Sequence, residues 1–181
     1  MTCIVALEHE GVLWMGGDSA AFREDEISCR ADPKVFQYGE FLFGFSGSFR
    51  IGQLLRYGFQ PPKQSGKSDM GYMVIDFVDA LRTFLDQKGT LLKEGSGDSH
   101  DSEIVVGFRR KIYVIESDFN VSMPLEKYVA SGSGSAYALG ALSVLEEIGI
   151  MHPSSKIETA LKVSAQHCPS VRAPFTIMSN N

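Results

Sequence analysis

Apolar residues open the chain in two short runs that a polar segment separates. Residues 4–7 and 12–15 are apolar, whereas 8–11 are polar or charged and end in a glycine. A polar segment that ends in glycine between two β-prone runs is typical of a tight hairpin. The sequence therefore predicts an antiparallel strand pair over 2–7 and 12–19.

Runs of β-branched and aromatic residues predict further strands along the chain. These strands lie over 20–23, 27–30, 34–38, 41–45, 104–108, 111–115, 128–130 and 175–178. An acidic turn joins the first two of them, and Arg109 and Arg110 form the turn of a hairpin in the second half of the chain.

Apolar residues at helical spacing predict four helices. These helices lie over 51–59, 70–85, 136–148 and 156–166. Ser48 is expected to cap the first helix and Ser68 with Asp69 the second, whereas Gly149 is expected to end the third. The Gly- and Ser-rich segment 89–101 is expected to be a mobile surface loop.

The order of these elements is a block of strands, then helices, then strands and helices again. Blocks of this kind imply an α+β layered domain with antiparallel sheets and segregated helix pairs, because parallel sheets need alternating βαβ units. No Pro-, Gly- or Ser-rich linker divides the chain into halves, so residues 1–181 are expected to form a single domain.

Composition excludes several classes of protein. Hydrophobic residues make up 44% and charged residues 22% of the chain, as in an ordinary globular protein. The net charge is -5, with 17 Lys and Arg against 22 Asp and Glu, which argues against nucleic-acid binding. The three cysteines are too scattered for a disulfide framework or a zinc site. Neither a signal peptide nor a membrane span is evident, so a cytoplasmic location without membrane contact is expected.

Thr2 is the first candidate for chemistry, because removal of Met1 would leave a hydroxyl and a free α-amine on one residue. Asp18 follows two glycines at a strand end, and Lys34 opens another strand. If these strands are neighbours in one sheet, both side chains reach Thr2. A buried lysine beside a hydroxyl would lower the hydroxyl pKa. The plainer alternative is that Thr2 is a strand residue, Asp18 caps a turn and Lys34 is on the surface.

Five motifs, in this order and at these intervals, resemble those of proteasome β-type subunits and the bacterial peptidase HslV. They are 2–7 (TCIVAL), 17–19 (GDS), 32–35 (DPKV), 44–47 (GFSG) and 132–138 (GSGSAYA). The resemblance spans nearly the whole chain. It implies an N-terminal nucleophile hydrolase with a four-layer αββα sandwich, in which the mature N-terminal threonine attacks a peptide carbonyl.

The resemblance also implies a role for each site residue. Thr2 would be the nucleophile, with its own freed amine as general base, and Lys34, held by Asp18, would stabilise it. The backbone N–H of Gly47 would donate to the oxyanion, and Ser133 would hydrogen-bond the N-terminal amine. It further implies a homo-oligomeric ring that cleaves peptides or unfolded proteins, with an ATPase as a partner. No cofactor is expected.

The chain departs from the family pattern near the end of its last predicted helix. The family usually has an aspartate there, followed by a serine or threonine, but residues 164–170 read SAQHCPS. Gln166 or His167 is expected near the position of the missing aspartate, and Ser170 is expected to match the hydroxyl. In HslV this turn also binds a cation, but only Cys168 agrees in identity, so no metal is expected here.

Three functional hypotheses remain open from the sequence. The first is a threonine peptidase that becomes active when Met1 is removed, with Phe45 and Ser46 lining the pocket beside Thr2. The second is a catalytically silent ring subunit, which the missing aspartate would explain. The third is an amidase with a small-molecule substrate on the same fold. Cys3 is a minor alternative nucleophile if trimming proceeds one residue further.

Overall fold

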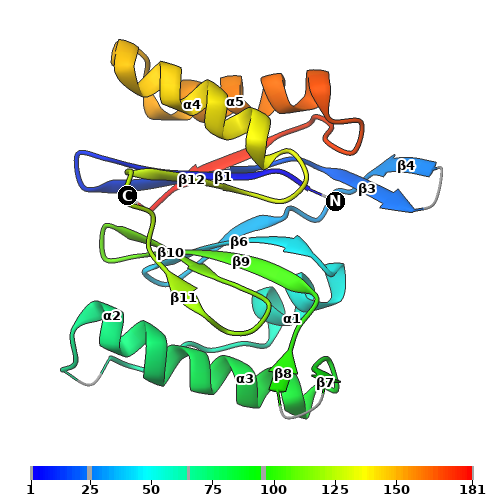
Figure 1. The fold of residues 1–181 in the computed structure, drawn as a ribbon, viewed down its shortest axis with the longest axis vertical. Coiled ribbons are helices and arrows are strands. Elements are labelled where there is room, and N and C mark those ends of the chain that lie inside the picture. Colours follow the sequence, from blue (N-terminus) through cyan, green and yellow to red (C-terminus); the bar gives the residue numbers. More distant parts are fainter. Residues whose placement is uncertain (1, 24–25, 65, 95–96, 181) are drawn as a thin grey trace.

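The protein is a four-layer αββα sandwich, with two antiparallel sheets face to face and helices on both outer sides (Figure 1). A computed structural model describes residues 2–23, 26–64, 66–94 and 97–180. The α+β class and the sandwich architecture expected from the sequence are confirmed. Within these ranges, no helix is both long and apolar enough to span a membrane.

The first sheet is built around the N-terminal hairpin. Its strand order is β12 (Tyr128–Ser131), β1 (Ile4–His9), β2 (Val12–Gly17) and β13 (Thr176–Ser179). The predicted hairpin is confirmed: β1 and β2 pair in antiparallel register from Ile4 opposite Gly17 to His9 opposite Val12. Glu10 and Gly11 make its turn with positive φ, as a tight hairpin requires.

The second sheet contains the central hairpins. Its strand order is β11 (Val121–Ser122), β10 (Lys111–Ile115), β9 (Ser102–Phe108), β6 (Phe41–Gly47) and β5 (Val35–Tyr38). Arg109 and Arg110 form the β9–β10 turn, as predicted, and both have positive φ. A separate two-stranded pair, β3 (Ala20–Arg23) and β4 (Glu26–Cys29), projects sideways from the end of the sandwich (Figure 1).

Helices cover the outer face of each sheet (Figure 1). α4 (Ser135–Ile148) and α5 (Pro153–His167) lie on the first sheet. α1 (Phe49–Tyr57), α2 (Asp69–Gly71), the π-helix η1 (Tyr72–Phe77) and α3 (Val78–Gln87) lie on the second. Ser48 and Ser68 accept hydrogen bonds at the helix starts, from the N–H groups of Ile51 and Gly71. Gly149 ends α4 in the left-handed conformation.

The second predicted helix is continuous but not α-helical throughout. Its middle is a π-helix, whose wider turns bring Tyr72, Met73 and Phe77 to the core together. The same widening turns Val74 and Ile75 outward, although apolar residues at helical spacing over 70–85 are expected to share a buried face. Regular α-helical spacing would not have placed residues 72 and 77 on one face.

The expected loop over 89–101 is wrong in part. Residues Leu92–Glu94 (β7) and Gly97–Ser99 (β8) pair as a short antiparallel hairpin. Its tip, 95–96, lies outside the described residues. The pair is polar, which is why the alternation of apolar residues gave no signal, and Asp98 anchors it to α3 by an ion pair with Arg82 at 2.6 Å.

Three apolar cores fill the spaces between the four layers. The one between α4, α5 and the first sheet contains Val5, Leu7, Leu142, Ile157 and Leu161. The one between the sheets contains Ile4, Leu13, Met15, Leu42 and Val105. The one between the second sheet and its helices is rich in aromatic residues, including Phe43, Phe77 and Tyr113. Successive residues of β1 alternate between the first two cores, which fixes the strand in place between two apolar layers.

Candidate active site

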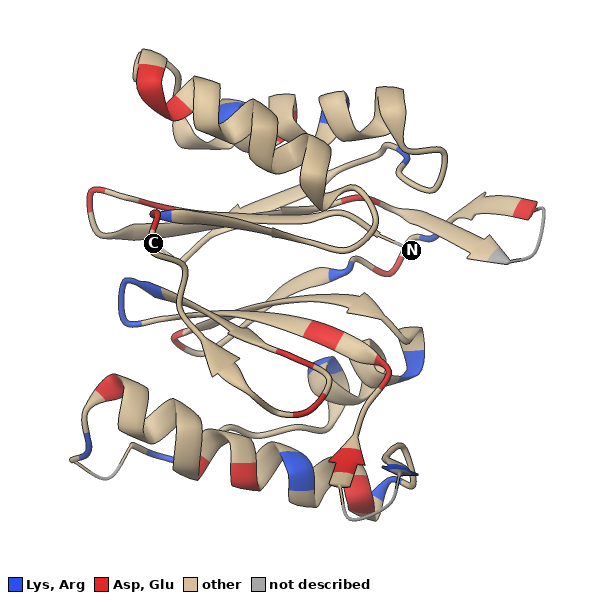
Figure 2. Ribbon diagram, viewed as in Figure 1, with Lys and Arg blue, Asp and Glu red and all other residues tan. Residues whose placement is uncertain are grey.

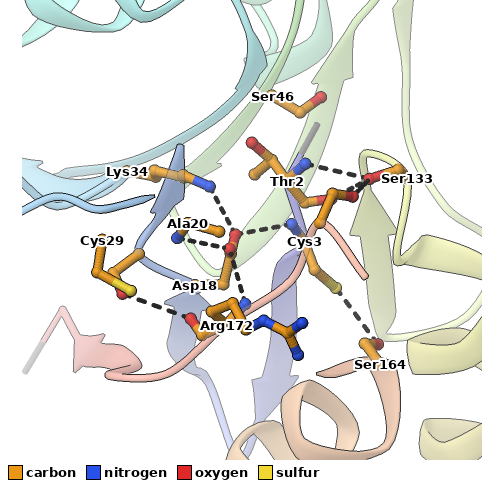
Figure 3. Close-up of polar contacts among 12 residues, drawn as sticks. Thr2, Cys3, Asp18, Ala20, Cys29, Lys34, Ser46, Ser133, Ser164 and Arg172 are labelled. Atoms are coloured by element: carbon orange, nitrogen blue, oxygen red, sulfur yellow. Dashed lines mark hydrogen bonds and ion pairs between the residues drawn. The ribbon is translucent and has the colours of Figure 1, made fainter. Parts of the chain in front are cut away.

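The candidate site lies at one end of the sandwich, where β1 begins and β2 ends. Thr2 precedes β1, Asp18 follows β2, and Lys34 precedes β5. All three are almost fully buried, with exposed fractions of 2%, 2% and 1%. Figure 3 shows the side chains of Asp18 and Lys34 converging beside Thr2. The structure therefore brings together residues that the sequence separates by up to 32 positions.

Asp18 is held by donors on both of its carboxylate oxygens. Oδ1 accepts from the backbone N–H of Cys3 at 2.9 Å and from Lys34 Nζ at 2.8 Å. Oδ2 accepts from the backbone N–H groups of Ala20 at 2.9 Å and Arg172 at 3.3 Å. These four donors satisfy the hydrogen-bonding needs of both oxygens of the buried carboxylate. Asp18 therefore holds two groups in place: the backbone at the start of β1, through Cys3, and the Lys34 amine.

Lys34 reaches the site from the second sheet, not from a neighbouring strand of the first. The expectation that Asp18 and Lys34 sit on adjacent strands of one sheet is therefore wrong. The two sheets are close enough here for the Asp18–Lys34 ion pair to bridge them. Burial lowers the pKa of the Lys34 amine from its ordinary value, and the charge and hydrogen bond of Asp18 oppose this shift. The result is a desolvated cation directed at the start of β1.

Ser133 contacts Thr2 from the turn between β12 and α4. The backbone N–H of Thr2 donates to Ser133 Oγ at 3.2 Å, and Ser133 Oγ lies 3.4 Å from the Thr2 carbonyl oxygen. Gly132 makes this approach possible: its φ is +91°, and a Cβ there would lie 2.3 Å from the Thr2 carbonyl oxygen. The glycines flanking Ser133 therefore let the turn close onto the N-terminal residue.

Gly47 ends β6 with a φ of +100°. The backbone N–H of Phe45, two residues earlier, donates to the Lys34 carbonyl at 3.2 Å. Backbone N–H groups alternate along a strand, so the N–H of Gly47 lies on this same edge of β6, beyond the start of β5. A side chain at Gly47 would collide with the Asp101 carbonyl oxygen at 2.4 Å, which explains the need for glycine.

Ser46 and Phe45 point to opposite faces of β6. Ser46 Oγ hydrogen-bonds Ser131 Oγ at 2.8 Å, across the gap between the two sheets and on the Thr2 side (Figure 3). Phe45 packs in the aromatic core and covers Gly52 of α1, where a Cβ would lie 2.1 Å from its ring. Phe45 also lines a small cavity with Asp32 and Pro33, just before Lys34, and its place in a pocket beside Thr2 stays a prediction.

The end of α5 differs from the sequence-based expectation. Gln166 and His167 are both exposed, and the ring of His167 stacks on Tyr137 at 5.4 Å between centroids. The expectation that one of them sits near the position of the missing aspartate is therefore wrong. Ser170, in contrast, is buried and lies 2.9 Å from Ser133 Oγ, as expected.

Sequence reasoning assigned no side-chain role to Cys168. Its Sγ lies 3.3 Å from Ser170 Oγ and 3.7 Å from Ser133 Oγ. The sequence signal that could have indicated this contact is the two-residue spacing between Cys168 and Ser170. In the turn after α5, two side chains at this spacing can face the same way.

Cys3 is a poor nucleophile in this structure. Burial is the main cause that raises the pKa of its thiol to about 11, although a hydrogen bond to Ser164 opposes the shift. Within the part of the chain that the structure describes, no cluster of three or more His, Cys, Asp or Glu side chains is arranged to hold a metal ion.

Comparison with known proteins places this geometry in context. No protein-family profile matches the chain. The ATP-dependent protease subunit HslV of Campylobacter hominis is 26% identical over 92% of this chain and 89% of its own length. The structure also superposes on HslV from Trypanosoma brucei with a TM-score of 0.69 and 15% identity, over 98% of both chains.

A second solved structure superposes more closely. It is the Thiobacillus denitrificans protein BPH in complex with epoxomicin, with a TM-score of 0.80 and 16% identity over 98% of this chain and 97% of the other. The chain is HslV-like and has the proteasome β-subunit fold. The resemblance drawn from its five motifs is thus confirmed, and the HslV-like chain keeps a threonine, an aspartate and a lysine together at one end of the sandwich.

Proposed function

We propose that this HslV-like chain is a threonine-type peptidase, active once the bond before Thr2 is cleaved. The observation that carries the proposal is the buried Asp18–Lys34 ion pair beside Thr2, with Ser133 on the Thr2 nitrogen. Burying a lysine is costly and contributes little to stability by itself. A desolvated cation beside a hydroxyl, however, favours the ionised form of that hydroxyl. The similarity to the HslV protease of C. hominis points to the same class of reaction.

The reaction assigns one task to each group. The Thr2 amine accepts the hydroxyl proton while Thr2 Oγ attacks the substrate carbonyl, and the Gly47 N–H donates to the oxyanion. The amine then gives the proton to the leaving amine as the C–N bond breaks, which leaves an ester on Thr2. Water, deprotonated by the same amine, hydrolyses the ester and restores the hydroxyl. Lys34 stays protonated throughout, because Asp18 compensates its charge.

A homo-oligomeric ring is part of the proposal. α4 presents an exposed apolar face that includes Tyr137, Val144 and Ile148, and Ile150 follows it with an exposed fraction of 86%. Its charged residues, Glu146 and Glu147, lie at its C-terminal end (Figure 2). An apolar face of this kind is typical of a subunit interface. We also propose an ATPase as a partner and unfolded protein as the substrate, since the C. hominis relative is an ATP-dependent protease subunit.

The experiment compares two forms of the protein that differ only before Thr2. One form exposes Thr2 as the first residue, verified by intact mass, and the other retains a residue before it. We expect hydrolysis of unstructured peptides by the first form only, because an amide nitrogen cannot act as a base. Thr2→Ala is expected to lose activity, and Thr2→Ser to keep part of it. Epoxomicin, which is bound in the T. denitrificans structure, serves as the inhibitor. Hydrolysis that survives in Thr2→Ala would refute the proposal.

A silent ring subunit is the second candidate, and one observation favours it. The turn after α5 offers Ser170 and a cysteine to the site, whereas the side chains of Gln166 and His167 point to solvent. If the amine is not held in its reactive form, the ring assembles without hydrolysing peptides. A form with Thr2 first that assembles but cleaves neither peptides nor small-molecule amides would support this candidate. Cleavage of small amides alone would support the amidase.

A further inference from the structure

A compact cluster of two serines and a cysteine lies behind the Thr2 nitrogen. Ser133 Oγ is at its centre, 3.2 Å from the Thr2 nitrogen, 2.9 Å from Ser170 Oγ and 3.7 Å from Cys168 Sγ. Cys168 Sγ also lies 3.3 Å from Ser170 Oγ, which closes a triangle of three side chains. Cys168 and Ser170 are buried, with exposed fractions of 7% and 3%. Water therefore has little access to the far side of this triangle.

The direction of the hydrogen bonds in the triangle decides what Ser133 offers to Thr2. The Ser133 hydroxyl has one proton, and Ser170 Oγ, the Thr2 carbonyl oxygen and, because Ser133 is exposed, water can each accept it. Ser133 Oγ accepts from the backbone N–H of Thr2 at 3.2 Å and from the Cys168 thiol at 3.7 Å. If the sulfur is replaced by a group that forms no hydrogen bond, Ser133 Oγ loses this contact and its hydroxyl is free to rotate. The third member of the triangle thus orients the group that contacts the base.

We propose that Cys168 is a positioning residue for the Thr2 amine, acting through Ser133 and Ser170 where the related peptidases use an aspartate. The inference rests on the function proposed above. Gln166 and His167 are exposed, whereas Cys168 is buried and its sulfur lies 3.7 Å from Ser133 Oγ.

The two serine hydroxyls also affect the ionisation of the Cys168 thiol. Burial raises the pKa of the Cys168 thiol, but hydrogen bonds from Ser170 and Ser133 outweigh it and leave the pKa below its ordinary value. The ionisable groups that face Cys168 are Asp18 after β2 and Cys3 before β1, together with the Thr2 amine once it is freed. A lower thiol pKa favours negative charge on the sulfur, and such charge favours the ammonium form of the amine, so Cys168→Ala is expected to lower the amine pKa.

The test uses the form with Thr2 first and three variants. Cys168→Ala removes the hydrogen-bonding atom, Cys168→Ser keeps one, and Cys29→Ala changes an exposed cysteine on β4 as the control. We expect Cys168→Ala to lower kcat about tenfold with KM within about twofold, the effect of one lost positioning hydrogen bond. The acidic limb of kcat/KM is expected to move to lower pH by about half a unit. Cys168→Ser is expected to recover most of kcat, and Cys29→Ala to match the parent protein.

Two further measurements separate this inference from a packing effect and from failure of the proposed function. Thermal unfolding of each variant reports packing. Equal losses of activity and stability in Cys168→Ala and Cys168→Ser, with no shift of the acidic limb, overturn the inference. If the parent protein hydrolyses nothing, the proposed function fails, and the pKa of the Thr2 amine is measured by pH-dependent acylation instead. An amine pKa that is lower in Cys168→Ala than in the parent supports positioning, and an equal value refutes it.

Discussion

At the residue scale, the buried Asp18–Lys34 pair is asymmetric. Asp18 keeps three backbone N–H donors if Lys34 is lost, whereas the Lys34 amine has its ion-pair partner in Asp18. Asp18→Asn strands a buried cation and is expected to cost about 3–5 kcal/mol of unfolding free energy. Lys34→Met leaves a carboxylate that is still hydrogen-bonded and is expected to cost about 1–3 kcal/mol. Urea unfolding of the two variants measures the difference.

A surface ion pair provides the control for these variants. Lys162 and Glu158 are paired on α5 at 2.6 Å, with both side chains largely exposed. Lys162→Met is expected to change the unfolding free energy by less than about 0.5 kcal/mol, because water screens the pair. Equal costs for Asp18→Asn and Lys34→Met would contradict the asymmetry. Asp18→Asn and Lys34→Met are both expected to lose peptidase activity. Lys34→Met removes the cation beside Thr2, and Asp18→Asn removes the carboxylate that Lys34 needs to remain charged.

The thiol of Cys3 gives a prediction about pH at the same scale. With a pKa of about 11, it is about one part in a thousand ionised at pH 8 and becomes a thiolate only when the pH rises towards 11. We expect iodoacetamide at pH 8 to modify Cys29 on exposed β4 within minutes and to leave Cys3 unmodified in the folded protein. Peptide mapping by mass spectrometry measures both. Rapid modification of Cys3 in folded protein would restore it as a candidate nucleophile.

The residue types of the candidate site could be predicted from the sequence, but their arrangement could not. Motifs alone point to Thr2, Asp18, Lys34, Gly47 and Ser133, and the structure places them at one end of the sandwich. The origin of Lys34 in the second sheet could not be predicted, because strand patterns do not tell which sheet a strand joins. The triangle of Ser133, Cys168 and Ser170 was missed because it forms between two turns that are distant in the sequence.

At the element scale, prediction succeeded where apolar residues form a continuous run or recur at a regular spacing. The strands of the first hairpin and the helices α4 and α5 have such patterns, and their positions agree with the sequence prediction to within a few residues. The pattern failed at η1, because a change of helical period leaves no simple mark on apolar spacing. It also failed at β7 and β8, whose polar strands pair through the backbone and are joined to α3 by the ion pair of Asp98 with Arg82.

The end of β6 shows how one residue limits an element. Gly47→Ala would bring a Cβ within 2.4 Å of the Asp101 carbonyl oxygen at a φ of +100°. Because the neighbouring atoms are backbone, the strand end must shift, at an expected cost of about 2–4 kcal/mol and with loss of activity. Gly39→Ala is the matched control: its φ is +56° and nothing lies within 4 Å of the added carbon, so it isolates a conformational cost of about 1 kcal/mol. Chemical denaturation compares the two, and equal costs would show that the contact with Asp101 relaxes easily.

At the scale of the whole molecule, the two outer helical layers differ in what they leave exposed. The layer of α1, α2, η1 and α3 carries charged side chains along its length, whereas α4 is charged only near its C-terminal end (Figure 2). α4 buries Ala138 and Leu142 against the first sheet and exposes Tyr137, Val144 and Ile148 on the other side. A helix that is apolar on both sides needs a second partner layer. We expect another copy of this chain to supply it.

Val144→Glu tests this expectation, because Val144 has an exposed fraction of 56% at the middle of the apolar face of α4. A carboxylate there is solvated in the monomer but desolvated in an assembly. The variant is therefore expected to fold as a monomer with unchanged thermal stability. Its assembly equilibrium is expected to shift towards smaller species. Thr83→Glu adds the same charge to the exposed side of α3 and is expected to leave the assembly intact. Native mass spectrometry of the two variants, at equal concentration, measures the distribution of species. An assembly that survives Val144→Glu but not Thr83→Glu would place the subunit contact on the opposite helical layer and assign the apolar face of α4 to a different partner.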